Sequence, residues 1–152
     1  MKLFQIEEPD GTPLDSDGPG AAVGIELSPA KGAAVAVAAG GNAELIPGAD
    51  GTARISATGL DDATALGALL LQLRERAEKA LARPVTHAVV ALDADGAVRA
   101  ALTGAAAAAG LTLLRVIRAE EAAALARAGT AADAPALGAA IQAEDDAALL
   151  LR

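Results

Sequence analysis

Residues 24–37 read GIELSPAKGAAVAV, and this stretch decides how the fold begins. Two apolar, strand-like runs flank the segment Ser28-Pro29-Ala30-Lys31. Serine and proline favour turns, so the stretch predicts a β-hairpin. A glycine, a strand and a tight turn in this order are also typical of hairpins whose backbone N–H groups bind phosphate. The sequence therefore raises the question of whether this turn can hold a phosphate.

The composition predicts a single domain whose core is built from small side chains. The chain has 152 residues, of which 53% are hydrophobic, and alanine is the commonest residue type. Phe4 is the only aromatic residue, so Ala, Val, Leu and Ile must fill the core. Because alanine contributes little buried area, we expect modest stability and self-association into a homo-oligomer.

The charge and the cysteine content argue against several classes of function. The formal net charge is −8 and no run of Lys or Arg occurs, which disfavours nucleic acids and anionic membranes as partners. Without cysteine, the chain forms no disulfide, no thiolate metal site and no Cys nucleophile. Acidic residues and prolines stand where a signal peptide needs an apolar stretch, and no apolar segment is long enough for a transmembrane helix. We therefore expect a soluble, cytoplasmic protein.

The pattern along the chain predicts an acidic Pro/Gly leader at residues 1–20 and a single lobe at residues 21–152. Strands are expected at 21–27, 33–39, 43–46, 86–93 and 111–117, and helices at 60–84, 97–110, 119–129 and 133–152. The fold class is therefore α/β, of the ribonuclease-H-like or actin-like ATPase-lobe type. Its mixed sheet combines an antiparallel three-strand meander with two parallel strands, and helices cover both faces.

Several segments occur in the order in which a known family has them. They are LFQIEEP at 3–9, VGIELSPAKGAAVAV at 23–37, AELIPGADG at 43–51, LRERAEKALARPVTHAVV at 73–90, AAGLTLLRVIRAEEAAALA at 108–126 and LGAAIQAE at 137–144. Together they resemble the first lobe of the ATPase domain of DnaK-type heat-shock chaperones, and especially the HscA-type branch that serves iron–sulfur cluster assembly. The family's insertion subdomain, second lobe and peptide-binding domain have no counterpart here. The resemblance thus implies a truncated, degenerate ATPase lobe.

The resemblance implies that the hairpin is a vestigial nucleotide site. The matching positions are Gly24, Glu26, Ser28 and Lys31. The family's turn has a glycine and two threonines, so that N–H groups and hydroxyls approach the phosphates and the hydrated metal. Here Pro29 removes a backbone donor, and Ser28 adds a side chain where close approach needs none. Lys31 could meet an anion, although a lysine in a turn is more often a solvated charge.

The family's catalytic glutamate also has no counterpart. Its Asn-Glu-Pro triplet aligns with Arg118, Ala119 and Glu120, so the carboxylate stands one residue late. On a helix, that residue points about 100° away from the required direction. The lysine that would assist phosphoryl transfer belongs to the missing insertion. Since transfer needs metal, phosphate cradle and base together, we expect no ATPase activity.

Two function hypotheses follow from the resemblance. The first is a non-catalytic, chaperone-like module that binds or regulates a protein and needs no cofactor. The alternative is a residual fragment that binds ATP or ADP with Mg²⁺ and acts in protein folding or iron–sulfur cluster assembly. By resemblance, the expected partner is a co-chaperone or an iron–sulfur assembly factor.

The candidate partner contacts also come from the resemblance. Arg115 matches a J-domain contact of the family, while Leu149, Leu150 and Leu151 match its interdomain linker. A solvated arginine at a strand edge is the simpler interpretation of Arg115. The three leucines must pack against their own chain, associate with another copy of it or bind a partner protein.

A weaker alternative rests on VVALDADGAV at 89–98. A strand followed by Asp-x-Asp-Gly is typical of haloacid-dehalogenase-type phosphatases, in which Asp93 would attack and Asp95 would act as acid and base with Mg²⁺. No lysine follows Lys79, and too little chain remains for that fold. A polar turn with a weak Mg²⁺ or Ca²⁺ contact is the simpler interpretation. His87, the single histidine, is expected at the surface or at a strand edge.

Overall fold

The computed structural model describes residues 20–93 and 96–150. The strands are β1 (Ala21–Ser28), β2 (Gly32–Ala39), β3 (Asn42–Leu45), β4 (Val85–Leu92) and β5 (Thr112–Arg118), and the helices are α1 (Ala63–Leu81), α2 (Gly96–Ala108), α3 (Ala119–Leu125) and α4 (Ala134–Leu150). Predictions for residues 1–19, Asp95 and Leu151 lie outside the described residues. None of the described helices is both long and apolar enough to cross a membrane.

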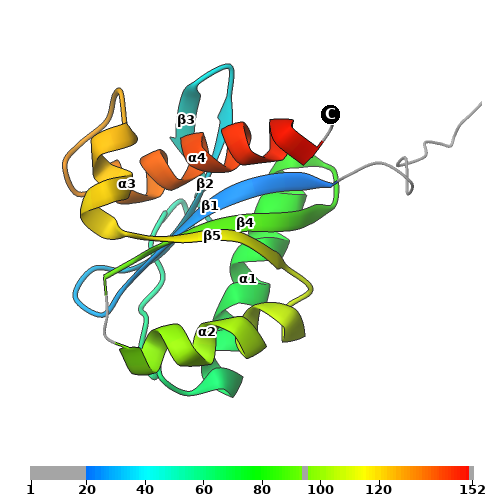
Figure 1. Ribbon diagram of the computed structural model, residues 1–152, viewed down its shortest axis with the longest axis vertical. Helices are drawn as coiled ribbons and strands as arrows, with labels where there is room; N and C mark the ends of the chain where they lie inside the picture. The colour runs from blue at the N-terminus through cyan, green and yellow to red at the C-terminus, as the bar shows by residue number, and fades with distance from the viewer. Residues whose placement is uncertain (1–19, 94–95, 151–152) are drawn as a thin grey trace, which may run out of the picture.

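The five strands form one mixed sheet in the order β3-β2-β1-β4-β5 (Figure 1). β2 pairs antiparallel with both β1 and β3, while β4 runs parallel to both β1 and β5. The predicted α/β class, with its meander and its parallel strands, is confirmed. Parallel neighbours need long crossover connections, which α1 and α2 provide here. This arrangement places β1 in the middle of the sheet.

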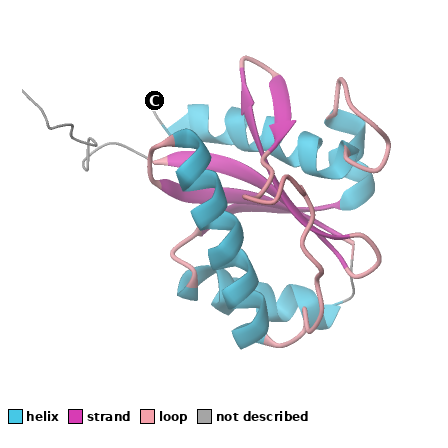
Figure 2. Ribbon diagram, turned by 180° about the vertical axis from the view of Figure 1, so that it is seen from behind, coloured by secondary structure: helices cyan, strands magenta, loops and turns pink. Residues whose placement is uncertain are grey.

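Helices cover both faces of the sheet, α1 and α2 on one and α3 and α4 on the other (Figures 1 and 2). Side chains alternate along β1, so Val23, Ile25 and Leu27 enter the large core against α1 and α2. By the same alternation, Gly24 and Glu26 face the layer that contains α4. The candidate site therefore lies on the face of the sheet that α4 covers, where the side chain of Glu26 is found.

The backbone of α4 lies directly against its neighbours because glycines stand at the contacts. A Cβ atom added to Gly24 would collide with the α4 backbone at Ala139 and Ala140. A Cβ atom added to Gly138 would collide with the carbonyl of Ala122 in α3. Glycine permits such close approach of two backbones, and the side chains of this layer are mostly alanines. Gly24 therefore serves the packing of α4 on β1.

The first helix begins and ends at signals present in its sequence. The Asp62 carboxylate accepts a hydrogen bond from the Thr64 N–H at 3.0 Å and so caps α1. Ala82 ends the helix in the left-handed conformation with φ of 55°, shortly before Pro84. These ends agree with the sequence pattern.

The third helix is shorter than its sequence predicts. Its periodicity favoured a helix to residue 129, but α3 ends at Leu125, and Ala126 is extended with ψ of 137°. The chain must leave the helix there because the loop at residues 126–133 returns towards the β1–β2 turn, where Asp133 makes an ion pair. This loop contributes to the candidate site.

Replacing Gly24 by alanine should destabilise the fold, because the new methyl group would meet the α4 backbone. Overpacking costs typically about 1–3 kcal/mol, and we expect the upper part of that range in urea unfolding followed by circular dichroism. Gly104→Ala is the matched control, because a Cβ atom there has no neighbour within 4 Å. That exposed position inside α2 should gain up to about 1 kcal/mol. Equal effects of the two variants would contradict the close packing of α4.

Candidate functional site

The buried carboxylate of Glu26 is the centre of the candidate site. Its side chain is 0% exposed near the end of β1. A carboxylate in such a place needs cations or hydrogen-bond donors to offset its lost hydration. Lys31 Nζ lies 2.9 Å from Oε2, and Arg54 Nη2 lies 3.0 Å from Oε1. Each oxygen of Glu26 therefore faces a positive charge of the protein itself.

The loop between α3 and α4 also contacts Lys31 and Arg54. The Ala132 carbonyl accepts hydrogen bonds from Lys31 Nζ at 3.0 Å and from Arg54 Nη2 at 2.7 Å. Arg54 also lies 3.2 Å from Asp133 Oδ1. We call Glu26, Lys31, Arg54 and Asp133 the ion cluster. Its two cations and two carboxylates cancel in formal charge, and they join segments that are far apart in the sequence.

Lys31 is not the solvated charge that its position in a turn favoured. Its side chain is 36% exposed, but the ammonium group is held by Glu26 and by the Ala132 carbonyl. Sequence reasoning missed Arg54, because this residue lies in a loop without a motif. The available signal was Glu26, since a carboxylate inside an apolar strand requires a cation from elsewhere.

The polar groups of the β1–β2 turn form hydrogen bonds within the protein. Ser28 Oγ accepts a hydrogen bond from the Lys31 N–H at 3.2 Å. The Ser28 hydroxyl donates to Asp93 Oδ2 at 3.4 Å, which connects the carboxyl ends of β1 and β4. Pro29 has no N–H to offer. The hydroxyl of Ser28 and the N–H of Lys31 are thus already engaged within the protein.

The residues aligned with the catalytic triplet form the start of α3. The Arg118 N–H donates to Glu121 Oε1 at 3.1 Å, and this bond lowers the pKa of Glu121 below its ordinary value. The Glu120 side chain is 70% exposed and lies 3.6 Å from Arg118 Nη1. Ala119 carries no functional group. The acids here stabilise a helix end and meet solvent.

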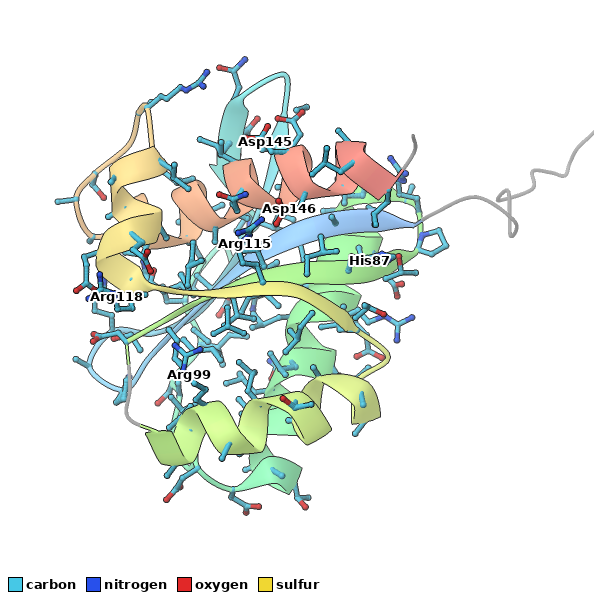
Figure 3. All side chains as sticks on the ribbon, in the orientation of Figure 1. His87, Arg99, Arg115, Arg118, Asp145 and Asp146 are labelled. Carbon is cyan, nitrogen blue, oxygen red and sulfur yellow. The ribbon has the colours of Figure 1, made fainter. Side chains whose placement is uncertain are left out.

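Arg115, the candidate co-chaperone contact, is paired within the chain. Its Nε lies 2.9 Å from Asp146 Oδ2 and its Nη2 lies 3.0 Å from Oδ1, a bidentate arrangement between β5 and α4 (Figure 3). Gln142 Nε2 donates to the same Oδ1 at 2.9 Å. Arg115 lies on the edge strand β5, as expected, but it also has a partner in the chain, because α4 brings Asp146 to it. The guanidinium group nevertheless remains partly open, since its side chain is 51% exposed.

This pair also sets the protonation of Asp146. The hydrogen bond from Arg115 is the largest influence and lowers the pKa of Asp146. Burial opposes that shift, while the hydrogen bond from Gln142 adds to it. The same pairing raises the pKa of Arg115. Asp146 is thus held as a carboxylate by its neighbours.

The remaining candidates lie on other parts of the surface. Leu149 and Leu150 at the end of α4 are 57% and 51% exposed. His87 lies inside β4, where its sheet partners are Ala22 of β1 and Thr112 of β5. Of the two expected positions of His87, the strand edge is excluded because β5 adds outside β4, whereas its partly exposed side chain agrees with a place at the surface. Within residues 20–93 and 96–150, no group of three or more His, Asp or Glu side chains could hold a metal ion.

Comparison with known families gives one match. The family model described as Hsp70 protein matches residues 53–134, which is more than half of the chain. The matched segment runs from the loop of Arg54 through α1, β4, α2, β5 and α3 to the start of α4. It contains two members of the ion cluster, Arg54 and Asp133, and leaves out the β1–β2 turn. No curated protein matches the chain.

Glu26→Gln should destabilise the protein, because it removes the charge between Lys31 and Arg54 while keeping the shape of the side chain. Removing one member of a buried ion pair costs about 3 kcal/mol or more, and the partial exposure of both cations places our expectation near 3. Urea unfolding at neutral pH measures the loss. Glu44→Gln on β3 is the exposed control and should change little. A loss no larger than that of the control would contradict the role of the ion cluster.

Asp146→Asn should make stability less sensitive to acid. The pKa of Asp146 is lowered in the folded state, so its stabilising contribution is present above the ordinary value of 3.8 and is lost as pH falls through the folded-state pKa. The difference in unfolding free energy between the parent and Asp146→Asn should therefore shrink as pH falls below 3.8. Asp145→Asn, at the exposed neighbouring position, is the control (Figure 3). A difference that stays constant over this pH range would contradict the assignment.

Proposed function

The chain belongs to the Hsp70 family, and we propose that it is a non-catalytic module, derived from a chaperone ATPase lobe, that binds another protein. The observation that carries this proposal is the ion cluster, in which Lys31 and Arg54 neutralise Glu26. By resemblance, the carboxylate at this position belongs beside the hydrated metal of Mg-ATP. Here the cations beside it are protein side chains.

The residues of the turn do not fit a nucleotide with its metal. Mg²⁺ is held by oxygen ligands and their waters, but both oxygens of Glu26 already face protein cations. A phosphate needs N–H groups and close approach, while Pro29 lacks an N–H and Ser28 bonds to Asp93. The ammonium group of Lys31 is held between Glu26 and the Ala132 carbonyl. These contacts support the loss of ATP binding and hydrolysis.

The position of the catalytic glutamate gives independent support. Ala119 stands there, and the next residue, Glu120, is on the surface with a 70% exposed side chain. Phosphoryl transfer depends on a placed base together with metal and phosphate contacts. A chain that lacks several of these parts keeps the fold of the lobe without its chemistry.

Protein binding is the function that this surface supports best. Members of the Hsp70 family bind protein substrates and co-chaperones. Arg115 keeps an exposed guanidinium face, so an acidic residue of a partner could compete with Asp146 for it. Leu149 and Leu150 add exposed apolar area at the end of the same helix. From the HscA-type resemblance, we propose a co-chaperone or an iron–sulfur assembly factor as the partner.

The other hypotheses have less support from the described residues. A residual nucleotide-binding fragment would need the turn to release Glu26 and Lys31 from each other. For the phosphatase, Asp93 is hydrogen-bonded to Ser28, and Asp95 lies outside the described residues. We therefore prefer the protein-binding module.

Thermal unfolding in the presence of nucleotide tests this proposal. We expect the midpoint, followed by circular dichroism, to be the same with and without millimolar Mg-ATP or Mg-ADP. A ligand at a hundred times its Kd would stabilise the fold by about 2.7 kcal/mol, which raises the midpoint of a domain of this size by several degrees. Such a rise would favour the residual ATP-binding fragment.

Ionic strength must be matched in this measurement. The chain has a net charge of −8, so added salt alone can screen repulsion and stabilise the fold. Magnesium chloride and sodium sulfate at equal ionic strength are the controls. Only a shift beyond theirs counts as nucleotide binding.

A further inference from the structure

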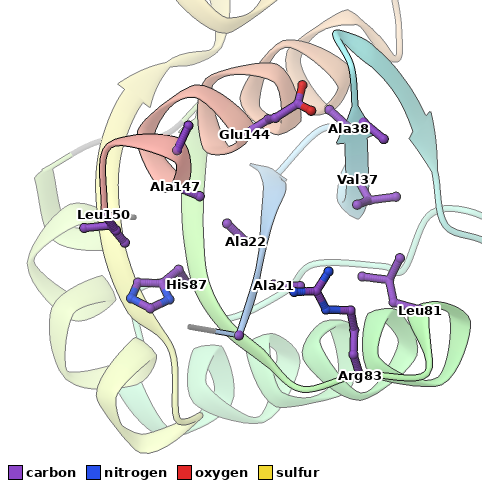
Figure 4. A pocket seen from close by; sticks show the side chains of 13 residues that line it. Ala21, Ala22, Val37, Ala38, Leu81, Arg83, His87, Glu144, Ala147 and Leu150 are labelled. Carbon is purple, nitrogen blue, oxygen red and sulfur yellow. The ribbon is translucent and has the colours of Figure 1, made fainter. Parts of the chain in front are cut away.

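A recess lies at the end of the sheet opposite the β1–β2 turn, where β1 and β4 begin (Figure 4). Its cavity volume is about 400 Å³, and it is open to solvent along one side. We call this recess the trough, and its defining residues are Ala22, Val37, Leu81, Arg83, His87 and Ala147. The ion cluster takes no part in it.

The apolar walls of the trough come from four elements. Ala22 belongs to β1, Val37 to β2, Leu81 to the end of α1, and Ala147 to α4. Leu150, which also lines the trough, is 51% exposed and has no full cover within the described part of the chain. Apolar surface that is recessed but open to water is typical of sites for apolar side chains of another molecule.

The two charged side chains at the trough, Glu144 and Arg83, differ in whether their charge is offset within the described residues. The Glu144 carboxylate accepts hydrogen bonds from the N–H groups of Gly40 and Gly41, at 2.6 and 2.9 Å, so the β2–β3 turn already offsets its charge. Arg83 is exposed and makes no ion pair with any described residue. Figure 4 shows its guanidinium group extending from the end of α1 towards the start of β1, with the His87 ring on the neighbouring strand. The trough thus joins an apolar interior to a cation that has no counter-ion among residues 20–93 and 96–150.

We propose that the trough binds an extended peptide segment of a partner protein, in which apolar residues stand next to an acidic residue. The apolar side chains enter between Val37, Leu81 and Ala147, and the carboxylate pairs with Arg83. A site for a small molecule would bury most of its ligand, whereas this trough is open along one side and suits a peptide. The inference rests on the proposed protein-binding function and assigns that function a second surface, separate from Arg115.

The single histidine of the chain allows a direct test. The imidazole resonance of His87, followed by proton NMR in the full chain, reports on the trough alone. The probe is a blocked peptide of sequence Leu-Ile-Leu-Glu-Glu, and we expect a saturable shift of that resonance. Leu-Ile-Leu-Lys-Lys tests the need for the acids, and Ser-Ser-Ser-Glu-Glu tests the need for the apolar residues. Both control peptides should bind more weakly.

Charge reversal then tests the role of Arg83. Arg83→Glu should weaken the glutamate peptide by about fivefold, the effect of one partly exposed ion pair, and should strengthen the lysine peptide. Arg99→Glu is the matched control, because it changes the net charge equally on α2, far from His87 in Figure 3. Ala147→Gln, which places a larger polar side chain in the apolar wall without changing the net charge, should weaken the glutamate and lysine peptides alike.

Several outcomes would overturn the proposal. One is the absence of a saturable shift of the His87 resonance; another is binding that responds equally to Arg83→Glu and Arg99→Glu. A His87 resonance that moves in Phe4→Ser without peptide would assign the trough to the chain's own leader, and one that moves with protein concentration would assign it to a second copy. Nucleotide binding in the unfolding assay would reject the proposed function but leave the peptide result standing, so the two failures can be told apart.

Discussion

The burial of one carboxylate, Glu26, is the constraint on which this structure depends. An ionised group inside an apolar layer is stable only when other charges and donors surround it. Lys31 from the adjacent turn and Arg54 from the loop before α1 form ion pairs with Glu26. The Ala132 carbonyl accepts a hydrogen bond from each of these two cations. The turn after β1, the loop of Arg54 and the loop after α3 therefore take their positions together.

The same constraint connects stability with function. A nucleotide site needs a carboxylate and donors that are free to meet a ligand, whereas here those groups satisfy each other. These internal ion pairs connect the end of β1 with the turn and the loop that pack around it. The pair of Arg115 with Asp146 and the trough are built from other residues than the ion cluster.

Local signals in the sequence sufficed for most of the elements. The apolar face and cap of α1, the buried runs of β4 and β5 and the hairpin at residues 24–37 all follow from periodicity and turn chemistry. The combination of an antiparallel meander with parallel strands followed from the order of the predicted elements. Sequence overestimated α3, because the return of the loop to the ion cluster outweighed helical periodicity.

The candidate site was less predictable, for a physical reason. Glu26 and Lys31 are neighbours in sequence, but Arg54 and Asp146 find their partners only after distant segments pack. The position of His87 depends on β5 adding outside β4, which no local pattern encodes. The family match begins at residue 53, so it bears on the loop of Arg54 but not on the turn that Arg54 neutralises.

The place of α4 on β1 has a consequence for how the chain acquires its structure. The central strand β1 precedes its parallel neighbour β4 by more than 50 residues and its covering helix α4 by more than 100. At ribosomal rates, Glu26 waits on the order of ten seconds for the loop and helix that enclose it. Folding dominated by such distant pairings is slow, and the unfinished sheet exposes apolar strands meanwhile. Because β4 and α4 arrive late, the period before they pack is the stage at which this fold is most exposed to aggregation.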